Sequence, residues 1–291
     1  MTAPAKQPLE ALPELAGRLA LLDPVGKKVA KAVRDGLGPG TVKDLLSGVW
    51  MGHALHPLLT DVVIGSWTSA NLLDLLGGED ADEAAQALIA VGIAAYPAVA
   101  VTGLVDWADG EPVGDDVRRI GLVHAALNSV ALGLYVGSLV SRRKGRRGQG
   151  VALALAGSAW MGAAGHLGGH LAFRLGQGVD QTVFDQGSGD WSDALAADEL
   201  LEGEATSAQV GDTPVLLVRD GDDVLALHDR CSHRGCSLAG GELSDGAITC
   251  PCHGSRFDLR SGAIEQGPAT APQPAFQART RAGRIEVRLH R

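Results

Sequence analysis

Two short stretches, Cys231-Ser-His-Arg-Gly-Cys236 and Cys250-Pro-Cys-His253, decide the fold of the last third of this 291-residue sequence. Each stretch pairs one cysteine with one histidine, Cys231 with His233 and Cys250 with His253. Zinc sites commonly draw on C-x2-4-C and H-x3-5-H pairs, each of a single residue type. One thiolate and one imidazole from each stretch suit a [2Fe–2S] cluster, in which thiolates hold one iron and imidazoles hold the other. The spacing therefore predicts this cluster, with zinc as the alternative metal.

The cysteine–histidine pattern resembles that of the Rieske family, and the resemblance extends over about residues 190–291. It implies a small antiparallel β domain in which two loops at one tip carry the four ligands. Short β-like runs separated by turn signals agree with such a domain; they are Pro214–Arg219, Val224–His228, Ala247–Thr249 and Arg284–Leu289. The run Gly267-Pro268-Ala269 matches the proline loop of the family, which would cover the cluster.

The remaining two cysteines, Cys236 and Cys252, lie beside the ligand residues. In the respiratory-complex branch of the Rieske family, cysteines at these positions form a disulfide, so the resemblance implies a Cys236–Cys252 disulfide. Two buried free thiols are the alternative, which a reducing cytosol would favour. The same branch has a serine where Ser255 stands, but it has a tyrosine where this chain has Phe257. Because hydrogen bonds to the cluster raise its reduction potential, we expect an intermediate potential here.

The first part of the chain has the composition of a membrane domain. Three segments of membrane-spanning length contain no charged residue: Ala84–Val105, Ile120–Ser141 and Gly148–Phe173. A fourth segment, Ala54–Leu76, has only two charged residues, Asp61 and Asp74. Because about 20 apolar residues of helix cross a bilayer, the sequence predicts a four-helix transmembrane domain over residues 50–176. A soluble helical bundle is the alternative. The expected fold class is thus a four-helix transmembrane bundle followed by a small antiparallel β Rieske domain over residues 190–291.

This membrane part resembles a bacterial four-helix membrane family of unknown function over about residues 50–180. The resemblance rests on Gly52-His53-Ala54-Leu55-His56-Pro57-Leu58-Leu59-Thr60-Asp61 and on Gly165-His166-Leu167-Gly168-Gly169-His170. It implies architecture and brings no activity with it. Residues 1–49 precede it as an amphipathic segment, since apolar residues recur there at four-residue spacing from Val25 to Leu37, with lysines between them. Such a helix lies on a membrane surface or packs on the bundle as an ordinary solvated helix.

Five histidines gather at one leaflet of the predicted bundle; they are His53, His56, His124, His166 and His170. A histidine inside a bilayer is costly and marks a functional site by default. We therefore consider His56, His124, His166 and His170 as ligands of haem b or as acceptors of a proton from quinol. The third interpretation is that they form interhelical hydrogen bonds, with Asp61 or Asn128 as partners.

The loop between the last two predicted spans is strongly basic, with Arg142, Arg143, Lys144, Arg146 and Arg147. The positive-inside rule places such a loop in the cytoplasm. We therefore expect a multi-pass protein of the cell membrane with four spans and its Rieske domain outside the cytoplasm, in agreement with a disulfide. The Arg142-Arg143 pair also suggests a twin-arginine export signal for a folded domain; a merely basic loop is the alternative.

Together these features predict a membrane-anchored iron–sulfur electron-transfer protein, an oxidoreductase component rather than a stand-alone enzyme. It would pass single electrons between quinol or haem and a redox protein partner, with membrane lipid around its helices. The linker Gly176–Ser192 would let the β domain move. The alternative is a membrane-tethered cytoplasmic ferredoxin-like component that serves an oxygenase or reductase; a redox or iron sensor is a further hypothesis without a positive sign. The net charge of −9 argues against a nucleic-acid partner.

Overall fold

The structure, a computed structural model, describes residues 8–290, and its chain divides into two compact units. The first unit is helical and combines the chain as far as Gly36 with Leu55–Gln177. The second unit contains the β-strands and combines Leu37–Ala54 with the chain from Gly178 onward. The segment Leu37–Ala54 therefore packs with strands that are distant in sequence, although helices of the first unit precede and follow it.

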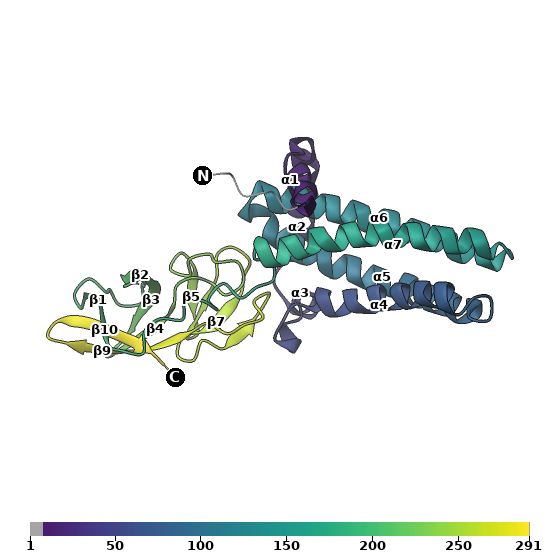
Figure 1. The fold of residues 1–291 in the computed structure, drawn as a ribbon. Coiled ribbons are helices and arrows are strands. Elements are labelled where there is room, and N and C mark those ends of the chain that lie inside the picture. Colours follow the sequence, from purple (N-terminus) through teal and green to yellow (C-terminus); the bar gives the residue numbers. More distant parts are fainter. Residues whose placement is uncertain (1–7, 291) are drawn as a thin grey trace. The chain divides into compact units, whose positions relative to one another are not determined.

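Four long helices form the first unit (Figure 1): α4 (Leu55–Leu76), α5 (Asp82–Gly110), α6 (Asp115–Arg143) and α7 (Arg147–Gly169), which the π-helical turn His170–Arg174 continues. Among the described helices, three are long and apolar enough to cross a membrane, namely Asp82–Val113, Asp115–Arg143 and Arg147–Arg174. They coincide with three of the predicted spans. The fourth, α4, falls short because two aspartates and several hydroxyl side chains lower its hydropathy, so the prediction of four spans is not confirmed.

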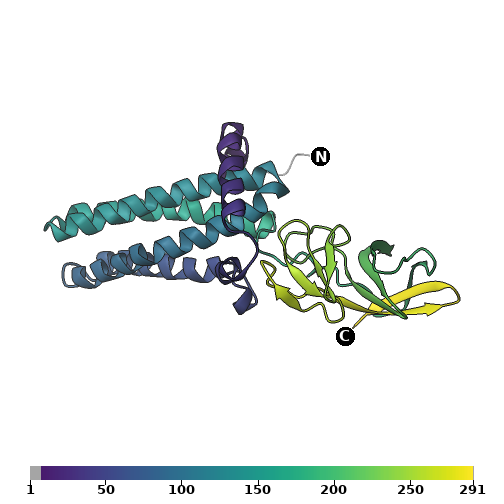
Figure 2. The same cartoon turned by 180° about the vertical axis from the view of Figure 1, so that it is seen from behind.

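Two shorter helices, α1 (Ala11–Gly17) and α2 (Asp23–Gly36), run across one end of this bundle (Figures 1 and 2) and pack on α5 and α6. Ion pairs hold α2 in place: Arg119 lies 2.7 Å from Asp23, and Arg34 lies 3.2 Å from Glu111. The hydrogen bond from Arg119 lowers the pKa of Asp23 to about 2. The part of the amphipathic segment from Ala11 to Gly36 thus packs on the bundle, and its contact with a membrane surface stays a prediction.

Charged side chains also join the helices at the opposite end of the bundle. Arg142, near the end of α6, pairs with Asp74 of α4 and with Asp82 of α5. Arg147 of α7 lies 3.7 Å from Asp74. The side chains of Arg142 and Asp74 are fully buried, whereas Arg143 is exposed. Arg142 therefore has a structural role that does not depend on any export signal.

Replacing Arg142 with leucine is expected to lower the free energy of unfolding by about 3–5 kcal/mol, because it leaves the Asp74 carboxylate buried without its closest partner. Arg143→Leu removes the same charge from the neighbouring exposed position and should change the stability by less than about 0.5 kcal/mol. Thermal unfolding of the detergent-purified protein, followed by circular dichroism, measures both effects. Equal losses in the two variants would contradict a structural role for Arg142.

Within the described residues, ten strands build the second unit as two antiparallel sheets. The six-stranded sheet has the order β1-β10-β9-β4-β3-β2, and the four-stranded sheet has the order β5-β6-β7-β8. The strands are β1 (Ser192–Ala196), β2 (Ala205–Val210), β3 (Thr213–Asp220), β4 (Asp223–His228), β5 (Glu242–Ser244), β6 (Ala247–Thr249), β7 (Arg256–Asp258), β8 (Ile264–Gln266), β9 (Ala275–Arg281) and β10 (Arg284–Leu289). The four predicted β-like runs coincide with β3, β4, β6 and β10.

Strand β3 contributes to two hydrophobic cores because successive side chains of a strand face opposite sides of the sheet. Leu217 belongs to one core, with residues from β1, β9 and β10. Leu216 belongs to the other, which also contains Cys231, Cys250 and Phe257. The predicted ligand loops are thus built on the second core, between the two sheets.

The linker predicted between the domains is attached to the β unit over most of its length. The N–H of Gln181 donates to the carbonyl oxygen of Ser232 at 2.9 Å. Thr213 Oγ1 donates to the Asp185 carboxylate at 2.6 Å. From Gly178 onward the chain belongs to the β unit, and the movement of this domain stays a prediction.

Candidate iron–sulfur site

Two loops of the β unit carry the four predicted ligands. Cys231 and His233 lie between β4 and β5, and Cys250 and His253 lie between β6 and β7. The side chains of Cys231 and Cys250 are joined by an S–H···S hydrogen bond. The imidazole rings of His233 and His253 lie edge to face, with their centroids 5.0 Å apart. Folding therefore brings two sulfur donors together and two nitrogen donors together.

The surroundings favour the metal-binding forms of Cys250 and His233. The hydrogen bond from Cys231 lowers the pKa of Cys250 to about 7, and the same bond raises the pKa of Cys231. Backbone N–H groups of Cys252 and His253 donate to the Cys250 sulfur, and the N–H of His233 donates to the Cys231 sulfur. Burial holds the pKa of His233 well below its usual value, so its imidazole is neutral. Thiolates that accept N–H bonds and neutral imidazoles are suitable ligands of an iron–sulfur centre.

This donor set fits a [2Fe–2S] cluster better than a single zinc ion. A structural zinc site places four donors tetrahedrally around one ion. Here the sulfur donors form one pair and the nitrogen donors form another, which suits two irons with different ligands. Cys231, His233, Cys250 and His253 are the residues that would hold the cluster, and a bound cluster supplies reversible one-electron transfer.

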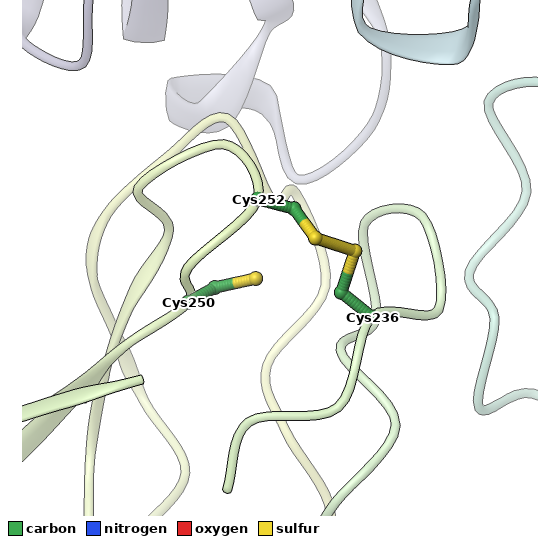
Figure 3. A group of neighbouring side chains, drawn as sticks. All are labelled: Cys236, Cys250 and Cys252. Carbon is green, nitrogen blue, oxygen red and sulfur yellow. A yellow bond between two sulfur atoms is a disulfide. The ribbon is translucent and has the colours of Figure 1, made fainter. Parts of the chain in front are cut away.

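A disulfide joins the two ligand loops, as predicted. Cys236 and Cys252 are bonded, with an S–S distance of 2.02 Å and Cα atoms 6.5 Å apart. Figure 3 shows the Cys250 side chain pointing toward this bond, and the three sulfur atoms lie within 4.8 Å of one another. Because two of these three sulfurs are bonded to each other, they are not available as thiolate ligands. The bond closes a loop over a sequence separation of 16, which stabilises the fold by about 3 kcal/mol in the chain-entropy model.

Ser255 connects the second ligand loop to the proline loop. Its buried hydroxyl oxygen accepts a hydrogen bond from the N–H of Ala269 at 3.0 Å, and its carbonyl oxygen accepts one from Cys250 N–H at 2.7 Å. The hydroxyl proton remains available for donation, because the Ala269 bond uses only the oxygen. Gly267 and Pro268, which come directly before Ala269, are buried as well. The structure thus places the proline loop beside the ligand loops, as the sequence predicted.

Two residues that the sequence did not single out hold the first ligand loop in place. The buried Asp229 carboxylate accepts hydrogen bonds from Ser237 Oγ at 2.7 Å and from Ala239 N–H at 2.8 Å. The buried Gln273 side chain accepts a bond from Ser232 N–H at 3.0 Å. Both are ordinary polar residues in sequence, and only the long-range contacts that they form reveal their role.

The bundle histidines find hydrogen-bond partners on neighbouring helices. His56 Nδ1 lies 3.0 Å from the carbonyl oxygen of Val99 on α5. His124 Nδ1 lies 2.8 Å from the carbonyl oxygen of Ala164 on α7, and its Nε2 lies 3.1 Å from the Asn128 amide nitrogen. Because both ring nitrogens of His124 are engaged, the third interpretation, interhelical hydrogen bonding, explains this residue best.

His166 and His170 lie at the C-terminal end of α7, whereas His53 belongs to the β unit. His166 Nε2 lies 3.0 Å from the carbonyl oxygen of Leu9, and His170 is the first residue of the π-helical turn. His53 is exposed, and its Nδ1 lies 3.1 Å from the carbonyl oxygen of Ala54. These contacts give no support to haem as a second cofactor.

The two ligand loops, their disulfide and the two-sheet core define a small iron–sulfur β domain. Comparison with known proteins agrees: residues 190–277 match the family model described as Rieske [2Fe-2S] domain, and residues 52–181 match the one described as predicted membrane protein (DUF2231). This chain belongs to the Rieske family, in which it carries the membrane-protein domain N-terminal to the cluster domain.

Curated relatives of the β unit include electron-transfer proteins. The anthranilate 1,2-dioxygenase ferredoxin subunit of Burkholderia cepacia is 35% identical over 34% of this chain and 93% of its own length. The cytochrome b6-f complex iron-sulfur subunit of Chlorobaculum tepidum is 30% identical over 32% of this chain and 50% of its own length. Among solved structures, the ferredoxin of carbazole 1,9a-dioxygenase from Nocardioides aromaticivorans IC177 covers 34% of this chain and 96% of its own, with 33% identity and a TM-score of 0.33.

Asp229→Ala is expected to destabilise the β unit by about 3 kcal/mol, because buried donors on the first ligand loop lose their acceptor. The matched control is Asp222→Ala, which removes an exposed carboxylate from the turn before β4. Thermal unfolding together with the iron and sulfide content per chain measures the effect. If Asp229→Ala retained both its unfolding temperature and its full iron content, Asp229 would not organise the loop.

Phe257→Tyr tests whether the hydroxyl missing at this position tunes the cluster. Phe257 is fully buried in β7, and a new hydrogen bond that favours the reduced form by about 1 kcal/mol would raise the reduction potential by about 40 mV for one electron. Phe276→Tyr is the matched control, since Phe276 is buried in the core that does not contain the ligand cysteines. Protein-film voltammetry measures the reduction potential of both variants. A potential that is unchanged or lowered in Phe257→Tyr would rule out this account, whatever the control shows.

Proposed function

We propose that this protein is a membrane-anchored Rieske electron carrier that passes single electrons between quinol in the bilayer and a redox protein partner. One observation carries the proposal: a single chain joins a site of two thiols and two imidazoles to a domain with three helices apolar enough to cross a membrane. The relatives support electron transfer, since one is a ferredoxin subunit and another is the iron-sulfur subunit of a cytochrome complex.

For the topology, we propose that α4 to α7 all cross the bilayer and that the β unit lies outside the cytoplasm. The disulfide supports this orientation, because disulfides persist in oxidising compartments. The basic loop between α6 and α7 supports this orientation less strongly than its number of basic residues suggests. Arg142 and Arg147 pair with acidic residues at the same end of the bundle, and the exposed basic residues of the loop are Arg143, Lys144 and Arg146.

The chain's own residues hold the two ligand loops in place. Asp229 and Gln273 fix the first ligand loop, and Ser255 fixes the second loop against the proline loop. The buried thiols and the neutral imidazole of His233 are held for binding before the cluster arrives. Such prior organisation keeps the surroundings of the cluster similar in both redox states, which favours fast electron transfer.

The second candidate is a membrane-tethered ferredoxin-like component that serves an oxygenase or reductase in the cytoplasm. The similarity to the dioxygenase ferredoxin subunit, at 35% identity over 93% of that protein, is the observation that favours it. The two candidates differ in electron donor and in the side of the membrane on which the β unit lies.

The deciding experiment presents two electron donors to the full-length protein in lipid nanodiscs. One is decylubiquinol, and the other is NADH with a ferredoxin reductase. Loss of the visible cluster absorption on adding decylubiquinol is the expected result, and the Cys231→Ser variant, which lacks one proposed ligand, is the control. Reduction by the reductase but not by the quinol would instead establish the ferredoxin-like function. Protease treatment of spheroplasts then shows on which side the β unit lies.

A further inference from the structure

The segment Leu37–Ala54 packs against the second ligand loop and the proline loop of the β unit. It contains α3 (Thr41–Ser47) and the short helix η3 (Val49–Met51). Pro39 packs so closely on Gly254, directly after the second ligand loop, that a Cβ there would have no room. Val49 packs in the same way on Gly267 of the proline loop. The segment is therefore a fixed part of the β unit at its ligand end.

Polar contacts add to this attachment. The N–H of Gly267 donates to the Asp44 carboxylate, and Lys43 lies within electrostatic range of His233. Burial raises the pKa of Asp44. These contacts place the polar face of α3 toward the ligand loops.

The polarity of this segment is inverted relative to a helix in water. Its buried side chains are polar, with Lys43 only 4% exposed and Ser47 only 3% exposed. Three of its large apolar side chains are exposed instead: Val42 is 62%, Leu45 57% and Trp50 63% exposed. Lysine is almost never fully buried, and large apolar side chains gain about 1.5–3 kcal/mol each on leaving water. Three such side chains on one short segment therefore indicate an apolar environment outside.

Two further observations indicate which environment this is. The indole N–H of Trp50 donates to the carbonyl oxygen of Leu45 at 3.2 Å, so the segment satisfies the polar atom of the ring itself. Only four residues separate Trp50 from Leu55, where α4 begins, and the match to the membrane-protein family begins at residue 52. Tryptophan at such a position is typical of the membrane–water interface.

We propose that Val42, Leu45 and Trp50 form an interfacial foot, which inserts into the boundary layer of the lipid bilayer and holds the ligand loops of the β unit at the membrane surface. The foot rests on the membrane anchoring proposed above but not on the direction of electron transfer. Its consequence is that the ligand loops are presented to a lipid-dissolved redox partner rather than to the open aqueous phase.

Site-selective tryptophan quenching in vesicles tests the foot. The full-length protein is reconstituted into phosphatidylcholine vesicles whose acyl chains carry bromine at shallow positions, or no bromine. The fluorescence of the wild type minus that of Trp50→Phe isolates the emission of Trp50. Trp160→Phe reports in the same way on an exposed tryptophan of α7, and Trp191→Phe reports on one in the β unit that lies against Arg279 and Arg288.

We expect the brominated lipid to quench Trp50 to an extent comparable with Trp160, and aqueous iodide to quench Trp191 but not Trp50. If the lipid quenches Trp160 while iodide quenches Trp50, the bundle is anchored and the foot is wrong. If neither agent quenches Trp50, protein covers it and the foot is also wrong. If the brominated lipid does not quench Trp160, the helical bundle is not in the bilayer, which contradicts the proposed membrane anchoring and with it the foot.

A second measurement does not alter Trp50. Val42→Cys introduces a reactive thiol into a chain whose other cysteines are bonded to each other or buried at the proposed cluster site. An environment-sensitive fluorophore at this thiol should shift its emission to the blue when the protein enters vesicles. The same label on Asp212→Cys, in the exposed turn between β2 and β3, should show no shift. Identical emission from the two sites would overturn the proposal.

Discussion

The β unit depends on one constraint: two thiols and two imidazoles on separate loops must be held in contact before a cluster can bind. Loops by themselves lose conformational entropy when they are fixed, at about 1–2 kcal/mol for each residue. This chain offsets that cost with a covalent bond between Cys236 and Cys252 and with buried hydrogen bonds from Asp229 and Gln273. The ligands themselves then need little rearrangement.

The helical unit solves a related problem by placing its charges at the ends of its helices. Arg142, Asp74 and Asp82 form ion pairs at one end, while Arg119 and Asp23 form one at the other. A buried ion pair is strongly destabilising only when one partner is missing. Within the bundle, buried polar side chains bond to one another across helices, as do Asn71 and Tyr135, which lie 2.8 Å apart. This distribution suits a hydrocarbon environment, in which every polar group needs an internal partner.

Much of the site was predictable because its chemistry is encoded in short sequence patterns. The spacing of Cys231, His233, Cys250 and His253 restricts the metal centre on chemical grounds alone, and the resemblance to a known family supplied the disulfide. The strands were predictable where alternation was regular, as in β3 and β10. The roles of Asp229 and Gln273 were not predictable, because a polar residue acquires such a role only through partners that are distant in sequence.

Two expectations from the sequence are not confirmed, and each has a physical reason. The linker Gly176–Ser192 was expected to let the β domain move because it is long enough, yet its backbone bonds to the β unit. The fourth span was inferred from length, although the aspartates of α4 lower its hydropathy. Asp74 shows why such a residue is tolerated there, since Arg142 neutralises it within the bundle.

The sequence by itself determined the chemical nature of both parts, because ligand spacing and charge-free segments are local properties of the chain. The tertiary structure decided which segments belong to which unit and which roles single residues have. It showed that Leu37–Ala54 belongs to the β unit, that Arg142 is a structural residue, and that His124 bonds to neighbouring groups. These facts depend on contacts between segments far apart in sequence, and only the packed chain brings those segments together.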